Sequence, residues 1–165
     1  MIALRAIDTS FREIKRRYDE RHHGQGHGLV CKQGFYTNCT VLKLQKPFWT
    51  NDSMAQVRNR SGIFFSIWIN AESARKSRAS YNIHALKLRE MKSYRITSKD
   101  FALEFRKKFV KTPWPNVSVD YGPLTLMEGW ETVSLNQLEE TVLPMLERFH
   151  QVSPLLDHLL EKRSR

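Results

Sequence analysis

The stretch from Ser61 to Met91 constrains the fold of this chain more than any other part of the sequence. It contains two segments, Gly62 to Asn70 and Tyr81 to Met91, with the period of two that is typical of β-strands. A basic connector, Ala71 to Ser80, joins them. The pattern therefore predicts two neighbouring strands at the centre of a sheet.

The two sides of these strands predict different roles. In the first strand both sides are apolar enough to be at least partly covered, whereas in the second only one side is clearly apolar. We expect the side with Ile67 and Leu86 to be structural. The side with Trp68, Lys87 and Arg89 is expected to stay open, and it is the first candidate for function.

Short patterns elsewhere predict further strands and helices around this centre. Ser10 and Glu13 match a capping box at the start of a helix that ends near Arg21. Trp49 is expected to anchor the core. Further expected elements are an extended segment over 34–48, a helix over 97–111, a hairpin formed by 117–121 and 124–130, and two final helices that begin at Ser134 and at Ser153, the first broken or kinked by Pro144.

The chain length and these elements together predict the fold class. A chain of 165 residues is long enough for one well-buried core and too short for two ordinary domains. We predict one α+β domain over 1–165, with an antiparallel sheet of about four or five strands and helices mainly on one face.

Composition narrows the setting of the protein. No apolar run approaches the roughly 20 residues that span a bilayer, so no membrane association is expected. The first eight residues do not form a secretory signal, and two cysteines are too few for a disulfide framework. A cytoplasmic location is the simplest expectation.

Positive charge is concentrated in the first two thirds of the chain. Residues 1–112 contain 23 Lys and Arg against 9 Asp and Glu, whereas residues 113–165 contain 4 against 8. An excess of this kind attracts polyanions and speeds encounter with them. It favours an anionic partner without identifying one.

Histidine and cysteine side chains of the right types for zinc gather between residues 22 and 39. They are His22, His23, His27, Cys31 and Cys39. Their spacing lacks the paired ligands of structural zinc sites, and interleaved glycines leave the histidines free to move. We therefore predict no metal site and no cofactor, and interpret this segment as a flexible loop followed by ordinary cysteines.

Candidate catalytic residues are few. Glu90 and Lys92 have the spacing of half a metal-dependent nuclease site, for which Asp52 and Asp120 are the available partners. The chain lacks the phosphate-binding glycine loop, the Gly-x-Ser-x-Gly motif and the His-Glu-x-x-His motif. His84 is interpreted as a half-buried structural histidine.

The leading hypothesis is a nucleic-acid-binding module without enzymatic activity. Phe64, Trp68 and Tyr81 would stack on bases while the basic side chains meet phosphates. The alternatives are a metal-dependent nuclease or other hydrolase, and a scaffold that docks an acidic protein partner. The predicted nucleic-acid-binding residues are Trp68, Arg75, Lys76, Arg78, Lys87 and Arg89.

Overall fold

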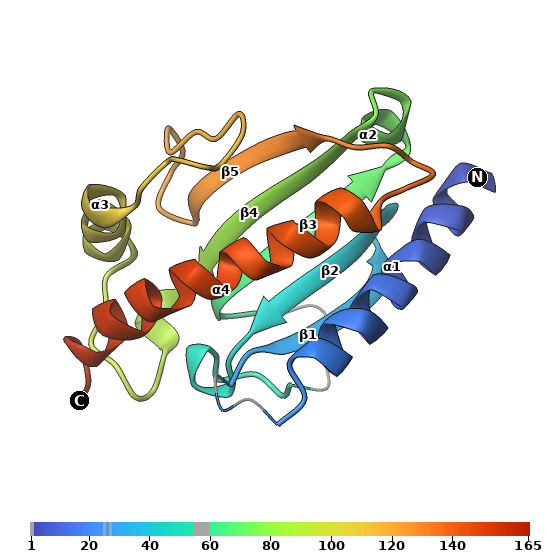
Figure 1. The fold of residues 1–165 in the computed structure, drawn as a ribbon. Coiled ribbons are helices and arrows are strands. Elements are labelled where there is room, and N and C mark those ends of the chain that lie inside the picture. The colour runs from blue at the N-terminus through green and yellow to red at the C-terminus, as the bar shows by residue number, and fades with distance from the viewer. Residues whose placement is uncertain (1, 25, 27, 55–59) are drawn as a thin grey trace.

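Five strands pair in chain order, β1 to β5, into a single antiparallel sheet, with helices joining and flanking them (Figure 1). The structure is a computed structural model that describes residues 2–24, 26, 28–54 and 60–165. It confirms the predicted α+β class and the antiparallel sheet. The elements are α1 (Ile2–Arg21), β1 (Val30–Tyr36), β2 (Cys39–Gln45), η1 (Pro47–Trp49), β3 (Gly62–Asn70), α2 (Ala71–Arg75), β4 (Arg78–Leu86), η2 (Leu88–Glu90), α3 (Ser98–Lys108), β5 (Thr125–Thr132) and α4 (Glu139–Glu161).

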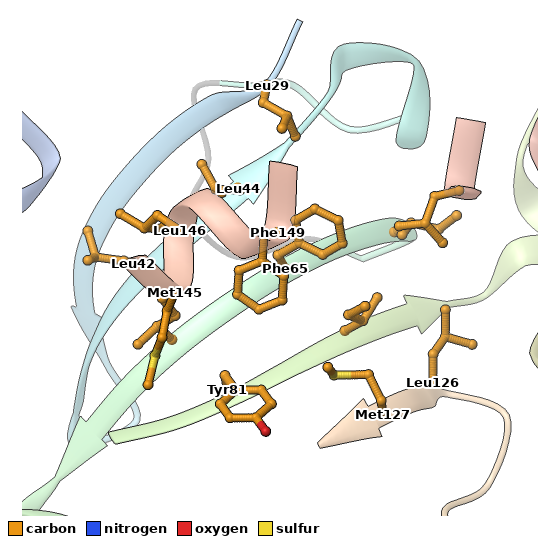
Figure 2. Packing of buried hydrophobic residues seen from close by; sticks show 14 of the residues in the cluster. Leu29, Leu42, Leu44, Phe65, Tyr81, Leu126, Met127, Met145, Leu146 and Phe149 are labelled. Atoms are coloured by element: carbon orange, nitrogen blue, oxygen red, sulfur yellow. The ribbon is translucent and has the colours of Figure 1, made fainter. Parts of the chain in front are cut away.

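Two long helices, α1 and α4, lie side by side on one face of the sheet (Figure 1). The Phe149 ring of α4 stacks on the Phe65 ring of β3, with centroids 4.5 Å apart and planes 11° apart. Figure 2 shows Met145 and Leu146 of α4 beside this pair, near Leu42 and Leu44 of β2. All of these side chains are buried, so the core lies between the sheet and the two helices. None of the helices in the described ranges combines the length and apolarity that crossing a membrane requires.

The first strand of the predicted central pair, Gly62 to Asn70, is confirmed as β3. The second strand, β4, has different bounds from those predicted. β4 starts earlier than predicted, at Arg78, and ends at Leu86, because Lys87 takes a left-handed conformation (φ 47°) that cannot continue a strand. The basic connector contains a short helix, α2. Asn70 caps the short helix α2: its Oδ1 accepts from Ser73 N at 2.8 Å, while Ser73 Oγ accepts from Asn70 N at 2.9 Å.

The assignment of the two sides was right for β3 and wrong for β4. Ile83 and Ala85 are fully buried beneath the helices, and His84 and Leu86 share the opposite face with Trp68. The predicted strand ran to Met91 and so counted Lys87 and Arg89 on the side of Ile83 and Ala85, whereas β4 ends at Leu86 and its side with Tyr81, Ile83 and Ala85 is apolar throughout.

Three further elements differ from the prediction. Residues 34–48 form two strands rather than one, since Thr37 and Asn38 both take positive φ (53° and 59°) and close a two-residue hairpin. Helix α1 begins at Ile2, so Ser10 lies inside it and Glu13 pairs with Arg16 instead of reaching back. Residues 117–121 form no strand and contribute only an isolated bridge, Ser118 to Glu128.

The two predicted C-terminal helices are one helix, α4, which begins only at Glu139 and contains both Pro144 and Pro154. Proline at position 154 leaves the carbonyl of His150 without its usual amide donor. The Ser153 hydroxyl donates to that carbonyl at 2.9 Å, so this serine supports the helix interior rather than capping a new helix. The prediction that Trp49 anchors the core is confirmed, because its side chain is fully buried and donates from Nε1 to Asp157 Oδ1 at 2.9 Å.

We expect Phe149→Ala to lower the free energy of unfolding by about 3–5 kcal/mol, because a buried ring stacked on the sheet is lost and a cavity remains. Urea unfolding followed by circular dichroism measures this change. The matched control is Phe35→Ala, since the Phe35 side chain is 54% exposed and its loss should change stability by no more than about 0.5 kcal/mol. Equal effects of the two substitutions would contradict this account of the core.

Candidate functional site

The side chains of the sheet that point away from α1 and α4 form what we call the open face. Among the described residues, no helix packs over this face, which carries Phe64, Ser66 and Trp68 of β3 and Asn82 and His84 of β4. Tyr36 and Lys43 complete a shallow hollow of about 530 Å³. A hollow of this size with mixed apolar and polar walls is large enough for a small molecule or part of a larger one.

The strand register places one polar side chain from each strand in a single row across the open face. The row runs through Lys32, Lys43, Ser66, Asn82 and Glu128, and we call it the polar row. Ser66 Oγ donates to Asn82 Oδ1, and Asn82 Nδ2 donates to Glu128 Oε1 at 3.2 Å. These bonds hold the floor of the hollow in a fixed arrangement, because directly opposed cross-strand side chains lie within reach of each other.

Lys43 is the most unusual member of the polar row. Its side chain is only 1% exposed, and its ammonium nitrogen lies 3.9 Å from the centroid of the Phe64 ring. Burial, together with repulsion from Lys32, lowers the pKa of the Lys43 amine to about 7, against an opposing attraction from Asp52. A fraction of this amine is therefore neutral near neutral pH, where it can accept a hydrogen bond or act as a nucleophile.

His84 lies beside this amine and is also affected by burial. Desolvation lowers the pKa of its imidazole, partly offset by the backbone carbonyl of Leu124 and by Glu128. Its Nδ1 lies 3.4 Å from the Leu124 carbonyl oxygen and 3.3 Å from Thr125 Oγ1. The expectation of a half-buried histidine agrees with this position, although His84 lies on the open face rather than on the structural side.

A second row on the open face carries two tryptophans. Trp68, Ser80 and Trp130 are direct cross-strand neighbours on β3, β4 and β5. The Arg78 guanidinium carbon lies 3.6 Å from the centroid of the Trp130 ring, which is cation–π geometry. Lys76, at the end of α2, lines the same shallow depression as both tryptophans. We call Trp68, Trp130, Arg78 and Lys76 the tryptophan cluster.

Three of the six predicted binding residues lie in this cluster, and three do not. Trp68, Lys76 and Arg78 come together as described, whereas the exposed Arg75 lies on α2 outside the depression. The exposed Lys87 follows the opposite end of β4. Beyond it, a separate hollow is rimmed by Arg89, Arg95, Arg163 and Arg165.

Sequence reasoning missed Trp130 and misplaced Tyr81. The predicted hairpin over 117–130 included Trp130 but gave no register, and only the pairing with Ser80 brings it beside Trp68. Tyr81 is fully buried on the helix-covered side, and its hydroxyl donates to the Pro115 carbonyl, so it cannot stack on a ligand. Phe64 does lie on the open face, but it is 6% exposed beneath the Lys43 amine.

The residues considered for a nuclease are not gathered into a site in the described part of the chain. The Glu90 carbonyl accepts from Asn51, and the Asp52 carboxylate accepts from the backbone amides of Arg60 and Ser61. Asp120 lies in the segment before β5, and no cluster of possible metal ligands among the described residues includes any of these carboxylates.

The cysteines considered as metal ligands lie far apart. Cys31 pairs with Leu44 at one end of the β1–β2 hairpin, and Cys39 pairs with Tyr36 at the other. Cys31 is buried on the helix-covered face, whereas Cys39 lines the hollow on the open face. A single metal cannot bind both thiols. His23 is exposed, and His27 lies outside the described residues.

The lowered pKa of Lys43 predicts a pH-dependent stability. The amine has a pKa of about 7 in the fold and near 10.5 in the unfolded chain. The unfolded chain therefore binds more protons between these values, so stability rises with pH there, by at most about 1.4 kcal/mol per pH unit. Below pH 7 the Lys43 amine is protonated in both states, so the folded protein carries the whole free-energy cost of burying a charged amine. Lys43→Met should exceed the wild type in stability at about pH 6.5, and its advantage should shrink towards about pH 9.

Chemical unfolding of the wild type and of Lys43→Met across this pH range measures the difference between their free energies of unfolding. Contributions from most other titrating groups cancel in that difference. Lys32, Asp52 and His84 are the charged groups that act on Lys43 and remain in both proteins. Lys107→Met, at an exposed position of α3, is the control and should show no change of its advantage with pH. A constant advantage of Lys43→Met at every pH would contradict the buried, discharged state of this lysine.

Comparisons of the chain with models of known protein families, with curated proteins and with solved structures found no match. The function must therefore be argued from the chemistry of the open face. That face combines a buried polar floor, two tryptophans and cations at one end.

Proposed function

We propose that this protein binds single-stranded nucleic acid through the open face of its sheet, as a binding module rather than an enzyme. The observation that supports this most is the tryptophan cluster. Trp68 and Trp130 lie in one cross-strand row on a face over which no described helix packs, with Arg78 against one ring and Lys76 beside them. Aromatic side chains on the face of a sheet are a common means of stacking single-stranded bases, and here one tryptophan lies on the central strand β3 and the other on the edge strand β5.

The spacing of the two tryptophans suits successive stacking contacts. They lie two strands apart, which corresponds to about 9.5 Å between their backbones. Both side chains are half-buried. The Arg78 guanidinium covers one face of the Trp130 ring, so a base at that position would stack on the planar guanidinium or displace it. Stacking on such rings tolerates any base, because every base has a π face.

The charges around the cluster favour a polyanion. The chain carries a formal net charge of +10, and the excess lies in the residues before 113. Near the tryptophans, Arg78 and the exposed Arg75 and Lys76 are the cations, although Lys76 also forms an exposed ion pair with Glu72 at 3.0 Å. Exposed pairs of this kind contribute little, so the lysine can turn to a phosphate at small cost.

Trp68→Ala and Trp130→Ala should each weaken binding of a single-stranded oligonucleotide by about 1–3 kcal/mol, or about 5- to 150-fold in Kd. Fluorescence anisotropy with labelled mixed-sequence RNA and DNA at low salt measures the affinity. Phe35→Ala removes an exposed aromatic from the helix-covered side and should leave affinity unchanged. Absence of binding to either nucleic acid, or equal losses with Phe35→Ala, would exclude this function for the face.

The cations should determine the salt dependence of the same affinity. Replacing Arg75, Lys76 and Arg78 together by alanine should reduce the slope of log Kd against log salt by about 0.7 for each phosphate that these side chains neutralise. The control combines Lys107→Ala, Lys108→Ala and Lys111→Ala, which removes the same number of charges from exposed positions of α3 and of the residues that follow it. An equal reduction by this control would show that only the net charge of the protein matters.

The same measurements separate the proposal from docking of an acidic protein. The hollow rimmed by Arg89, Arg95, Arg163 and Arg165 is the feature that favours this second function. Polyglutamate binding that is lost on Arg89→Ala but unaffected by Trp68→Ala and Trp130→Ala would support it. If oligonucleotides showed the same pattern, the stacking proposal would be wrong.

A further inference from the structure

Three side chains with metal-binding atoms meet where the end of α1 packs against α4, on the opposite side of the sheet from the open face. His22 directly follows α1, and Glu147 and His150 lie three residues apart on α4 and so share one side of that helix. His22 Nε2 lies 2.8 Å from Glu147 Oε1, and the two imidazole rings stack with centroids 4.2 Å apart and planes 15° apart. One ligand atom from each of the three residues lies within 4.8 Å of the others.

The chemistry of the three groups suits zinc. Two imidazoles and one carboxylate form the ligand set of many zinc sites in which a fourth position stays open to water. The spacing of Glu147 and His150, three residues apart on one helix, also occurs in the metal-binding helices of di-iron and di-manganese carboxylate bundles. In a tetrahedral site with zinc bonds of about 2.0–2.1 Å, the ligand atoms are about 3.3 Å apart. Each imidazole nitrogen binds a metal in the plane of its own ring, so the rings of His22 and His150 must turn out of their present stack to share one ion.

The neighbours of the cluster define what a metal would replace. His150 Nε2 is hydrogen-bonded to the Tyr18 hydroxyl. Burial raises the pKa of that hydroxyl, so it keeps its proton and can donate. A metal bound at His150 Nε2 would replace this hydrogen bond and leave the Tyr18 hydroxyl beside the open position. Arg21 lies 4.0 Å from Glu147 and weakens the attraction for a cation without blocking it, because its side chain is 60% exposed.

We propose that His22, Glu147 and His150 bind one divalent transition metal ion, with zinc the best-fitting ion and water in the fourth position. The ion would join the end of α1 to α4 between residues more than 100 positions apart in the chain, and the same two helices also pair at the start of α4 through Arg17 and Glu139 at 2.8 Å. This site shares only His22 with the set considered from sequence, because its other ligands come from α4.

The test uses the full chain, stripped with a chelator and then titrated with zinc by calorimetry and with cobalt by absorption spectroscopy. We expect one ion per chain and the intense visible bands of tetrahedral cobalt. His150→Ala should weaken zinc binding by more than about 100-fold, since loss of an outer-shell partner alone costs about 10- to 100-fold. Glu147→Gln should also weaken it while retaining a side chain that can hydrogen-bond to His22, which keeps the test valid if His150→Ala fails to fold.

The matched control is His158→Ala, which removes an exposed histidine from the same helix and should leave affinity and spectrum unchanged. Absence of stoichiometric binding by the wild type would overturn the proposal. So would zinc binding that survives both His150→Ala and Glu147→Gln, because the ion would then lie elsewhere on the protein.

Discussion

The packing of α4 across the sheet is the interaction on which the rest of the structure depends. Its centre is the stacked pair of Phe65 and Phe149. The ring centroid of Trp49 lies 5.2 Å from that of Phe65, and the ring centroid of Trp114 lies 5.0 Å from that of Phe149. Because α1 and α4 both cover the same face, every strand has one side committed to the core and one side left for other uses. The direction in which each side chain points along β3 and β4 therefore determines whether it packs in the core or lies on the open face.

The sequence predicted the parts of the fold that local pattern controls. The alternation of β3 and the end of α1 near Arg21 follow from periodicity, and the structure agrees with both. It misassigned the side of β4 that the helices cover, because the predicted strand ran to Met91 and included Lys87 and Arg89 on the side of Ile83 and Ala85, whereas β4 ends at Leu86. It also misjudged Ser153, whose hydrogen bond to His150 matters only once a continuous helix has formed around Pro154.

The candidate sites likewise combine residues that are close in the sequence, which could be predicted, with residues that only the fold brings together. Trp68, Lys76 and Arg78 come from one short segment and were identified as neighbours, whereas Trp130 joins them only through the register of β4 with β5. The histidine cluster is a stronger case, because His22 and His150 come from opposite ends of the chain. Spacing along a sequence finds ligands that share a helix or a hairpin, and it cannot find ligands that two distant helices bring together.

The polar row distinguishes the open face from an ordinary solvent-exposed face of a sheet. A face exposed only to water would leave its lysines extended into solvent, and a face made only for packing would be apolar. Here Lys43 is buried over the Phe64 ring, and the Ser66 and Asn82 side chains bond to each other beneath the hollow. Burying an amine destabilises the fold, so an arrangement of this kind conflicts with stability alone and is typical of a site where a ligand is bound. The row lies next to the tryptophan cluster, in the adjacent register positions of the same strands. Under the proposed function, a base stacked on Trp68 would therefore lie directly beside the polar row.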